Sequence, residues 1–203
     1  VEGLESFVCY AAWSFDDTIR TNSASGGIAT ELYRFFSDKG YKLAGVSMTP
    51  MHTAEFSLSD SFESMPAYRN SKYVYSDAGN IYYEVGKNLV NQRGVLFIGL
   101  PCQVAALKKY LFVKKISLEL LFTVDIVCHG TTPEQFLGEH IEHIEKKKKK
   151  KAIHVEFRDP EEKTSSFTFS LKDAEHTFYK RRVKANDVYQ IGYHAGITYR
   201  DNC

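Results

Sequence analysis

Apolar residues recur along this chain with two spacings, one typical of helices and one typical of strands. Residues 28–38 place apolar side chains at helical spacing, and Gly40 follows them, so they predict an amphipathic helix with a glycine stop. Two largely apolar runs, 95–98 and 122–127, are typical of buried strands, and a helical pattern follows each of them. An alternation of this kind indicates an α/β fold.

Further segments complete the expected architecture. We expect strands over 7–13, 41–48 and 55–58, and helices over 81–91, 104–111 and 133–148. The stretch 153–178 alternates apolar and polar residues twice, which predicts antiparallel strands near the C-terminus. A weak boundary at residues 91–94 divides an N-terminal lobe, 1–91, from a C-terminal lobe, 92–203. The expected fold is therefore α/β, a mixed sheet flanked by helices in two poorly separated lobes.

Composition narrows the function classes. The chain has 203 residues, of which 43% are hydrophobic, so it can bury a substantial core. Its net charge of +1 gives no reason to expect nucleic-acid binding, and its apolar runs are too short to predict a membrane span. The first residues show no signal-peptide pattern, and four cysteines are too few for a disulfide scaffold. We therefore expect free thiols and a cytoplasmic protein.

Two cysteines follow the two buried-strand patterns, at positions where ligands bind in α/β folds. Pro101 predicts a helix start that puts Cys102 in the first turn, where the helix dipole favours the thiolate that iron binds. Cys128 follows the second apolar run, and neighbouring parallel strands would bring the two sulfurs close. A structural thiol at Cys102 and a redox dithiol remain alternatives. His129 fits a base, a donor to a cofactor or a packing residue equally well.

Two loops contain material for a phosphate or a flavin ring. Small residues at 23–27 precede the first predicted helix, so the free N–H groups there could hold a flavin pyrophosphate. The alternative is an ordinary loop with a serine N-cap, and the segment lacks the G-x-G-x-x-G fingerprint. Residues 67–77 combine Lys72 with several tyrosines, which suits a flavin or a packed surface loop.

Charged residues dominate the helix predicted over 133–148. His140 and His143 are spaced to share one face and could hold a metal, but the surrounding glutamates favour a solvated face. The lysine run 146–151 is typical of a helix end that projects into water.

Seven short segments occur in an order that resembles the coenzyme F420 hydrogenase/dehydrogenase beta-subunit family. They cover nearly the whole chain, and the Gly-x-Pro-Cys-Gln and Cys-His-Gly segments are the most specific. The segments are Cys9-Tyr-Ala-Ala-Trp13, Ile19-Arg20, Ser25-Gly-Gly27, Ser71-Lys-Tyr-Val74, Gly99-x-Pro-Cys-Gln103, Val124-Asp-x-x-Cys-His-Gly130 and Phe157-Arg-Asp159.

The resemblance implies an oxidoreductase that contains FAD and a 4Fe-4S cluster. Such a protein moves electrons between a reduced partner, here a ferredoxin-like electron-transfer domain or subunit, and a soluble hydride carrier such as the deazaflavin coenzyme F420. It implies no particular catalytic residue. It implies cofactor contacts at Ser23, Ser25, Gly26, Gly27, Ser71, Lys72, Tyr73, Pro101, Gln103, His129 and Gly130, and cluster ligands at Cys102, Cys128 and Cys203.

The chain also departs from the family pattern. Tyr75 stands where the family has glutamine, and Pro160 follows Phe-Arg-Asp where the family has Gly-Trp. The family continues with Cys-x-x-Cys where this chain ends at Cys203, so we expect a truncated C-terminal lobe and a cluster one ligand short. The alternative function is a degenerate, non-catalytic binding or scaffold module linked to polysaccharide biosynthesis.

Overall fold

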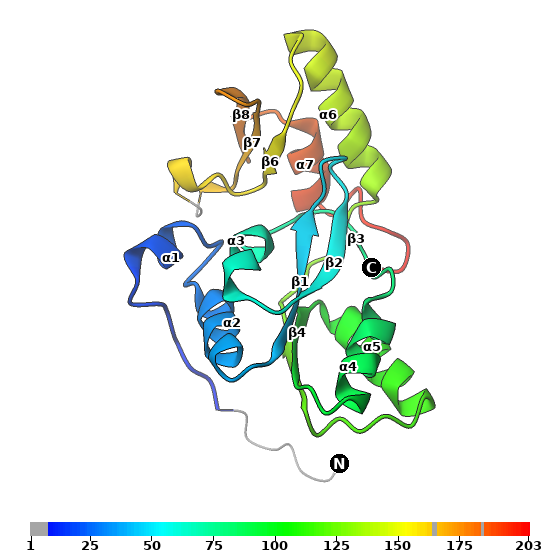
Figure 1. Cartoon of the computed structure of the whole chain (residues 1–203). Coiled ribbons are helices and arrows are strands. Elements are labelled where there is room, and N and C mark those ends of the chain that lie inside the picture. The colour runs from blue at the N-terminus through cyan, green and yellow to red at the C-terminus, as the bar shows by residue number, and fades with distance from the viewer. Residues whose placement is uncertain (1–7, 164–165, 184) are drawn as a thin grey trace.

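The computed structural model describes residues 8–163, 166–183 and 185–203, and their strands form two sheets (Figure 1). Sheet A has five strands in the order β3-β2-β1-β4-β5, and sheet B has three in the order β6-β7-β8. The strands are β1 (Lys42–Met48), β2 (Ala54–Ser59), β3 (Ser76–Asp77), β4 (Val95–Gly99), β5 (Leu121–Asp125), β6 (His154–Glu156), β7 (Thr168–Lys172) and β8 (Thr177–Arg182).

Sheet A is mixed, as the sequence predicts. Strands β1 and β2 form an antiparallel pair, whereas β1 with β4, β4 with β5 and β2 with β3 run parallel. Sheet B is antiparallel throughout, which confirms the strands expected near the C-terminus. The helices are α1 (Asp17–Thr21), α2 (Ile28–Asp38), α3 (Met65–Tyr68), α4 (Ile81–Val90), α5 (Pro101–Val113), α6 (Glu134–Lys148) and α7 (Val188–His194), with short 3-10 turns at Phe62–Ser64 and Pro160–Glu162.

The inner strand β4 is buried along its whole length because helices cover both faces of sheet A. Alternate side chains of a strand point to opposite faces. Val95 and Phe97 therefore join the core beneath α4 and α5, while Leu96 and Ile98 join the core beneath α2. Figure 1 shows α2 on one side of the sheet and the pair α4 and α5 on the other. A continuous apolar run is what such a two-sided strand requires.

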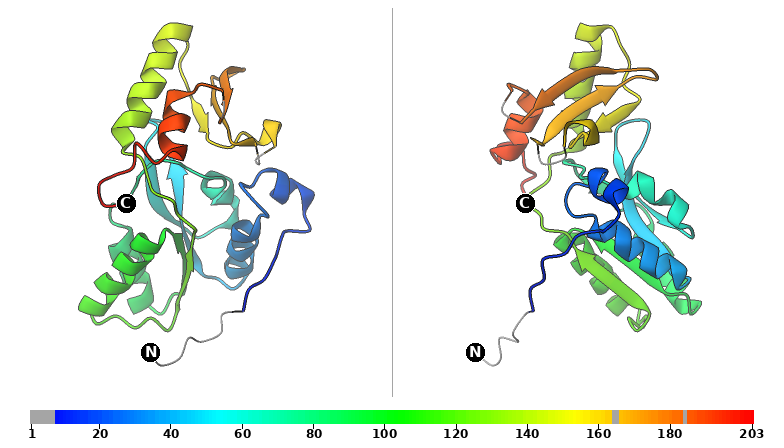
Figure 2. Two further views of the ribbon diagram at one scale, coloured as in Figure 1. Left: turned by 180° about the vertical axis from the view of Figure 1, so that it is seen from behind. Right: turned by 90° about the vertical axis from the view of Figure 1, so that its left-hand side faces the viewer.

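A separate core lies between sheet B and the helices α6 and α7 (Figure 2). Leu137, Ile141 and Ile144 on α6 pack with Phe169 and Leu171 of the central strand β7. These α6 residues recur at helical spacing, so one face of the helix is buried and the opposite face meets water. No helix in the described ranges is long and apolar enough to cross a membrane.

Some sequence expectations fail where the elements are short or exposed. The strand predicted over 7–13 is wrong for residues 8–13, which pair with no strand; Phe7 lies outside the described residues. Val8 and Tyr10 in this segment are exposed, so its apolar pattern does not correspond to a buried face. The helices α1 and α7 were missed because five and seven residues hold too few turns to show a period.

The division into lobes 1–91 and 92–203 stays a prediction. The expected boundary falls in the turn between α4 and β4, and β4 pairs with β1 across it through Lys42 and Val95. Sheet A thus draws strands from both segments.

A buried carboxylate joins three elements of the sheet B core. Asp187 is fully buried at the N-cap of α7, where it accepts a hydrogen bond from Gln190 N at 2.8 Å. Its other oxygen lies 2.7 Å from Tyr179 Oη on β8 and 3.0 Å from His140 Nε2 on α6. The expectation of a solvated face is therefore wrong for His140, because its ring turns inward to Asp187, while His143 is exposed.

Replacing Asp187 should destabilise the fold because it removes a helix cap and leaves two buried donors without an acceptor. We expect Asp187→Ala to lower the free energy of unfolding by about 3 kcal/mol. Urea denaturation followed by circular dichroism measures this change. The exposed Glu175→Ala serves as the control and should alter it by under about 0.5 kcal/mol. A loss below about 1 kcal/mol in Asp187→Ala would contradict the structural role.

Candidate functional site

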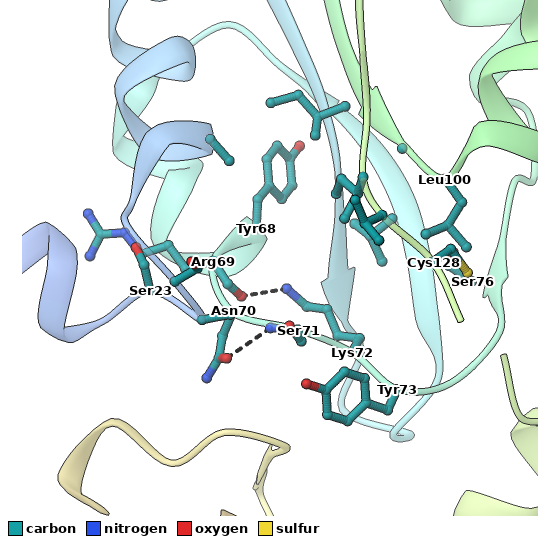
Figure 3. A pocket seen from close by; sticks show the side chains of 18 of the residues that line it. Ser23, Tyr68, Arg69, Asn70, Ser71, Lys72, Tyr73, Ser76, Leu100 and Cys128 are labelled. Atoms are coloured by element: carbon teal, nitrogen blue, oxygen red, sulfur yellow. Dashed lines mark hydrogen bonds between the residues drawn. The ribbon is translucent and has the colours of Figure 1, made fainter. Parts of the chain in front are cut away.

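A cavity of about 410 Å³ opens between the end of sheet A and the group formed by sheet B, α6 and α7, the sheet B lobe (Figure 3). Four stretches of chain wall it: residues 23–30 before and within α2, residues 68–74 after α3, the end of β4 with the start of α5, and residues 126–131 after β5. Tyr193 of α7, in the sheet B lobe, also lines the cavity. The carboxyl ends of parallel strands thus open onto a pocket, as in other α/β folds.

The wall formed by residues 23–30 is built mostly from small residues. Gly27 is the N-cap of α2 with a φ of 84°, and no side chain caps this helix. A Cβ at Gly27 would lie 2.8 Å from Ile19 Cγ2, and one at Gly26 would lie 2.8 Å from the Ala12 carbonyl oxygen. Glycine is therefore required at both positions. Ser23 donates its hydroxyl to the Ile19 carbonyl at 2.7 Å, so the serine N-cap alternative is wrong.

Amide donors remain open along this wall. In the described part of the chain, no hydrogen bond uses the backbone N–H of any residue from 24 to 30 as its donor. The first backbone N–H of α2 that donates a hydrogen bond is that of Glu31, and its acceptor is the Gly27 carbonyl. Donors at the start of a helix carry a partial positive charge, so this wall attracts anions.

The second wall contributes cations. Lys72 Nζ donates to the Arg69 carbonyl at 2.7 Å (Figure 3). It also donates to the Ala67 carbonyl at 3.1 Å. Burial lowers the pKa of Lys72 to about 8, because desolvation disfavours the ammonium form more than the charge of Glu156 favours it. Arg69 also lines the cavity, and its buried Nε has no hydrogen-bond partner among the described residues.

Tyr73 connects this wall to α7 in the sheet B lobe. Its ring stacks on Tyr193 with 4.5 Å between ring centroids, and its carbonyl accepts a hydrogen bond from Tyr189 Oη at 2.6 Å. Asn70, at a φ of 67°, donates to the Arg158 carbonyl at 2.8 Å and to Glu156 Oε2 at 3.0 Å. These contacts fix the loop between α3 and β3 against the loop after β6.

The parallel pair β4 and β5 places the two cysteines at one end of the sheet. Gly99 pairs with Asp125, so Cys102 and Cys128 each follow three residues after a paired position. Pro101 is the first residue of α5, and Cys102 lies in its first turn as predicted. Both thiols are exposed.

Gln103 holds the wall together rather than pointing a free amide into it. Its Oε1 accepts from Leu100 N at 2.9 Å, and its Nε2 donates to Ser76 Oγ at 2.8 Å. Gly130 lines the cavity at a φ of 139°, where a Cβ would collide with the Tyr199 ring.

Charge on the two other thiols acts on Cys128. Burial raises the pKa of Cys128; the Gly130 N–H, 3.3 Å from its sulfur, opposes this, while charge on Cys102 or Cys203 adds to it. Burial acts to raise the pKa of Cys203 as well, but hydrogen bonding with Thr131 and the charge of Arg200 outweigh it and lower that pKa. In the described ranges no group of three or more His, Cys, Asp or Glu residues could hold a metal ion. The three thiols therefore do not form a metal site by themselves.

The cavity gathers most of the residues singled out from the sequence. Pro101, Cys102, His129 and Cys203 lie outside its lining, and His129 is exposed. The sequence analysis missed Arg69, Asn70 and Tyr193; Arg158 was noted only within the Phe-Arg-Asp segment. The lining includes Ser23, Ser25, Gly26, Gly27, Ser71, Lys72, Tyr73, Gln103, Cys128 and Gly130.

Comparison with known families matches residues 92–203 to the family model for the C-terminal region of the beta subunit of coenzyme F420 hydrogenase/dehydrogenase. This match covers more than half of the chain. The chain belongs to the coenzyme F420 hydrogenase/dehydrogenase beta-subunit family. The matched model describes the C-terminal part of the beta subunit of these hydrogenases and dehydrogenases.

Solved structures add a likeness of fold. A chain of the F420-reducing [NiFe] hydrogenase complex from Methanosarcina barkeri, in a xenon-derivatised structure, superimposes with a TM-score of 0.60 at 18% identity. The alignment covers 94% of this chain and 62% of that one, so this chain spans under two thirds of its structural neighbour. No curated protein matches the sequence.

The opposite pKa shifts of Cys203 and Cys128 should appear in their reactivity. The thiolate is the nucleophile, so iodoacetamide at pH 7 should alkylate Cys203 several-fold faster than Cys128. Mass spectrometry of peptides from timed samples measures both rates. At a pH above the pKa of both thiols, the difference between the two rates should narrow. Faster labelling of Cys128 at pH 7 would contradict this arrangement.

Proposed function

We propose that the cavity binds FAD and that the chain is the flavin-carrying part of an oxidoreductase. The observation that carries this proposal is the wall of open N–H donors at residues 24–30, with Lys72 and Arg69 lining the same cavity. A pyrophosphate needs donors and positive charge together, and a glycine-rich helix start lets backbone approach it closely. The family match favours the flavin over other phosphate-bearing ligands.

The protein would position the cofactor, and bound FAD would supply hydride and single-electron chemistry. Residues 24–30 would bind the phosphates, and Gly26 and Gly27 would admit them without steric conflict. Tyr73 and Tyr193 add a stacked aromatic pair to the cavity lining. Lys72 has three N–H donors, of which two are held by backbone carbonyls, so the third is available to an anionic group.

Electron transfer to and from the flavin would need partners. We propose a ferredoxin-like domain or subunit as the donor and a deazaflavin, or another soluble hydride carrier, as the acceptor, within the cytoplasm. Cys102, Cys128 and Cys203 are proposed as part of the ligand set of a 4Fe-4S cluster. Cys102 and Cys128 follow neighbouring parallel strands at one end of sheet A, and Cys203 Sγ lies 3.5 Å from Thr131 Oγ1 in the segment after β5. The described residues do not complete that set, so no electron step is assigned to it. The likeness to a chain of a hydrogenase complex supports the proposal of partner subunits.

A negative charge placed at the helix start should repel the flavin phosphates. Ser25 is exposed and lines the cavity, so Ser25→Asp introduces a carboxylate without disturbing the core. We expect it to weaken FAD binding at least about tenfold, measured by the quenching of flavin fluorescence on titration with protein. Ser25→Asn has nearly the same shape without the charge, and it should bind within about threefold of the original chain.

The two variants separate the possible failures. If Ser25→Asp binds FAD as well as Ser25→Asn does, the phosphates lie elsewhere. If the unmodified chain takes up no flavin from a stoichiometric excess, the binding or scaffold module becomes the better explanation. Circular dichroism should be unchanged in Ser25→Asp, because an acid near a helix N-terminus is favourable to the helix.

The lowered pKa of Lys72 predicts a pH dependence of flavin binding. Because its pKa falls from 10.5 to about 8, Lys72 loses its charge as the pH rises through about 8. An anionic ligand favours the charged form, so FAD affinity should be full below that pH and decline above it. Lys72→Arg stays charged and should abolish the decline, whereas Lys72→Met should bind weakly at every pH. An unchanged decline in Lys72→Met would assign it to another group.

A further inference from the structure

Arg158 belongs to the sheet B lobe and bridges the two cavity walls that contain Ala24 and Tyr73. It lies in the loop between β6 and the turn at Pro160–Glu162, and its Nη1 donates to the Ala24 carbonyl on the first wall. Its Nε donates to Tyr73 Oη on the second wall at 2.5 Å. The partners lie 134 and 85 residues away along the chain, so one side chain joins three distant segments.

The guanidinium is fixed from several directions. It lies 3.8 Å from the centroid of the Phe167 ring, which orients its plane. The Arg158 carbonyl accepts from Asn70 Nδ2, so backbone and side chain are both tied to the wall that follows α3. No carboxylate in the described chain forms an ion pair with Arg158. Its planar, forked donors therefore serve only neutral oxygens and an aromatic face, an arrangement that arginine provides and lysine does not.

The contact with Ala24 has a consequence for the first wall. The C=O and N–H groups of a trans peptide point in opposite directions. When Arg158 holds the Ala24 carbonyl toward the sheet B lobe, the Ser25 N–H must point away from that lobe. Ser14 N acts in the same way on the Gly26 carbonyl, at 2.7 Å, and so directs the Gly27 N–H. Two outside donors thus set the orientation of the open amides.

We propose that Arg158 is a positioning residue that holds both walls of the cavity in register and orients the amide donors at residues 24–30. This role rests on the proposed function where it concerns flavin, but the fixing of the loop exists without any ligand. Loss of the guanidinium frees the Ala24 peptide and the Tyr73 hydroxyl together. The fold itself is held by the cores of sheets A and B, to which Arg158 does not belong.

The test compares Arg158→Ala, Arg158→Lys and Arg182→Ala with the original chain. Arg182 lies on β8, pairs with Glu162 and touches neither wall, so it is the matched control. Amide hydrogen exchange is measured without flavin in two segments, at the hydrogen-bonded amides of Ser14, Ser23 and Glu31 around the first wall and of Ser71 in the second. The dissociation constant for FAD is measured by fluorescence. Trp13, the one tryptophan of the sequence, gives a second reading of the loop, because a Cβ on Gly26 would lie 3.2 Å from it.

We expect Arg158→Ala to raise amide exchange in both segments and to shift the emission of Trp13, while the urea midpoint stays near that of Arg182→Ala. FAD should bind about tenfold more weakly, since hydrogen bonds from a charged group are lost. Arg158→Lys keeps the charge but cannot span both acceptors, so it should resemble Arg158→Ala. Added guanidinium ion at low millimolar concentration should restore slow exchange in Arg158→Ala and have no effect on Arg182→Ala.

The outcomes distinguish this proposal from the flavin assignment. Unchanged exchange in Arg158→Ala overturns the positioning role, whether or not the chain binds FAD. Raised exchange in a chain that takes up no FAD supports the positioning role and overturns only the flavin assignment. Raised exchange with unaltered FAD affinity overturns the claim that the oriented amides serve the flavin. Full recovery in Arg158→Lys would show that charge alone, rather than the forked geometry, is responsible.

Discussion

Five backbone positions pair in parallel between β4 and β5, and the location of the site depends on this ladder. Parallel strands end at the same edge of a sheet, so the segments that follow them must leave from neighbouring points. One of these segments becomes α5 and the other becomes the loop that contains Cys128. The burial of β4 on both faces keeps the ladder from slipping, because a one-residue shift would exchange the two cores.

The cavity keeps positive groups that an ordinary protein interior would neutralise. Lys72 donates to carbonyls rather than to a carboxylate, Arg158 does the same, and Arg69 has a buried nitrogen without a partner in the described chain. The whole chain has a net charge of only +1, so this concentration is local. Partly buried cations that form no ion pair with the described carboxylates destabilise the empty fold, and any anion that binds there relieves this unfavourable energy.

Sequence periodicity located the longer regular elements but neither the shortest helices nor the contacts between elements. The run 122–127, expected as a buried strand, instead forms the half-exposed strand β5 at the edge of sheet A. The helix predicted over 28–38 has the observed limits, and the buried strand β4 was expected almost to the residue. These segments bury a whole stripe or both faces, so packing agrees with local pattern. Arg158 shows the opposite case, because its partners Ala24 and Tyr73 come from distant parts of the chain that no local period can relate. His140 likewise required Asp187, 47 residues away, to turn inward.

The walls of the cavity are far apart in the order of synthesis. Its first wall begins at Ser23 and its last lining residue is Tyr193. Chains emerge from the ribosome with the N-terminal residues first, and contacts between distant segments form only after a large loss of chain entropy. Sheet A can assemble once β5 has emerged, but the stacking of Tyr73 on Tyr193 must wait for α7. The cavity is therefore complete only after the C-terminal segment has folded onto sheet A.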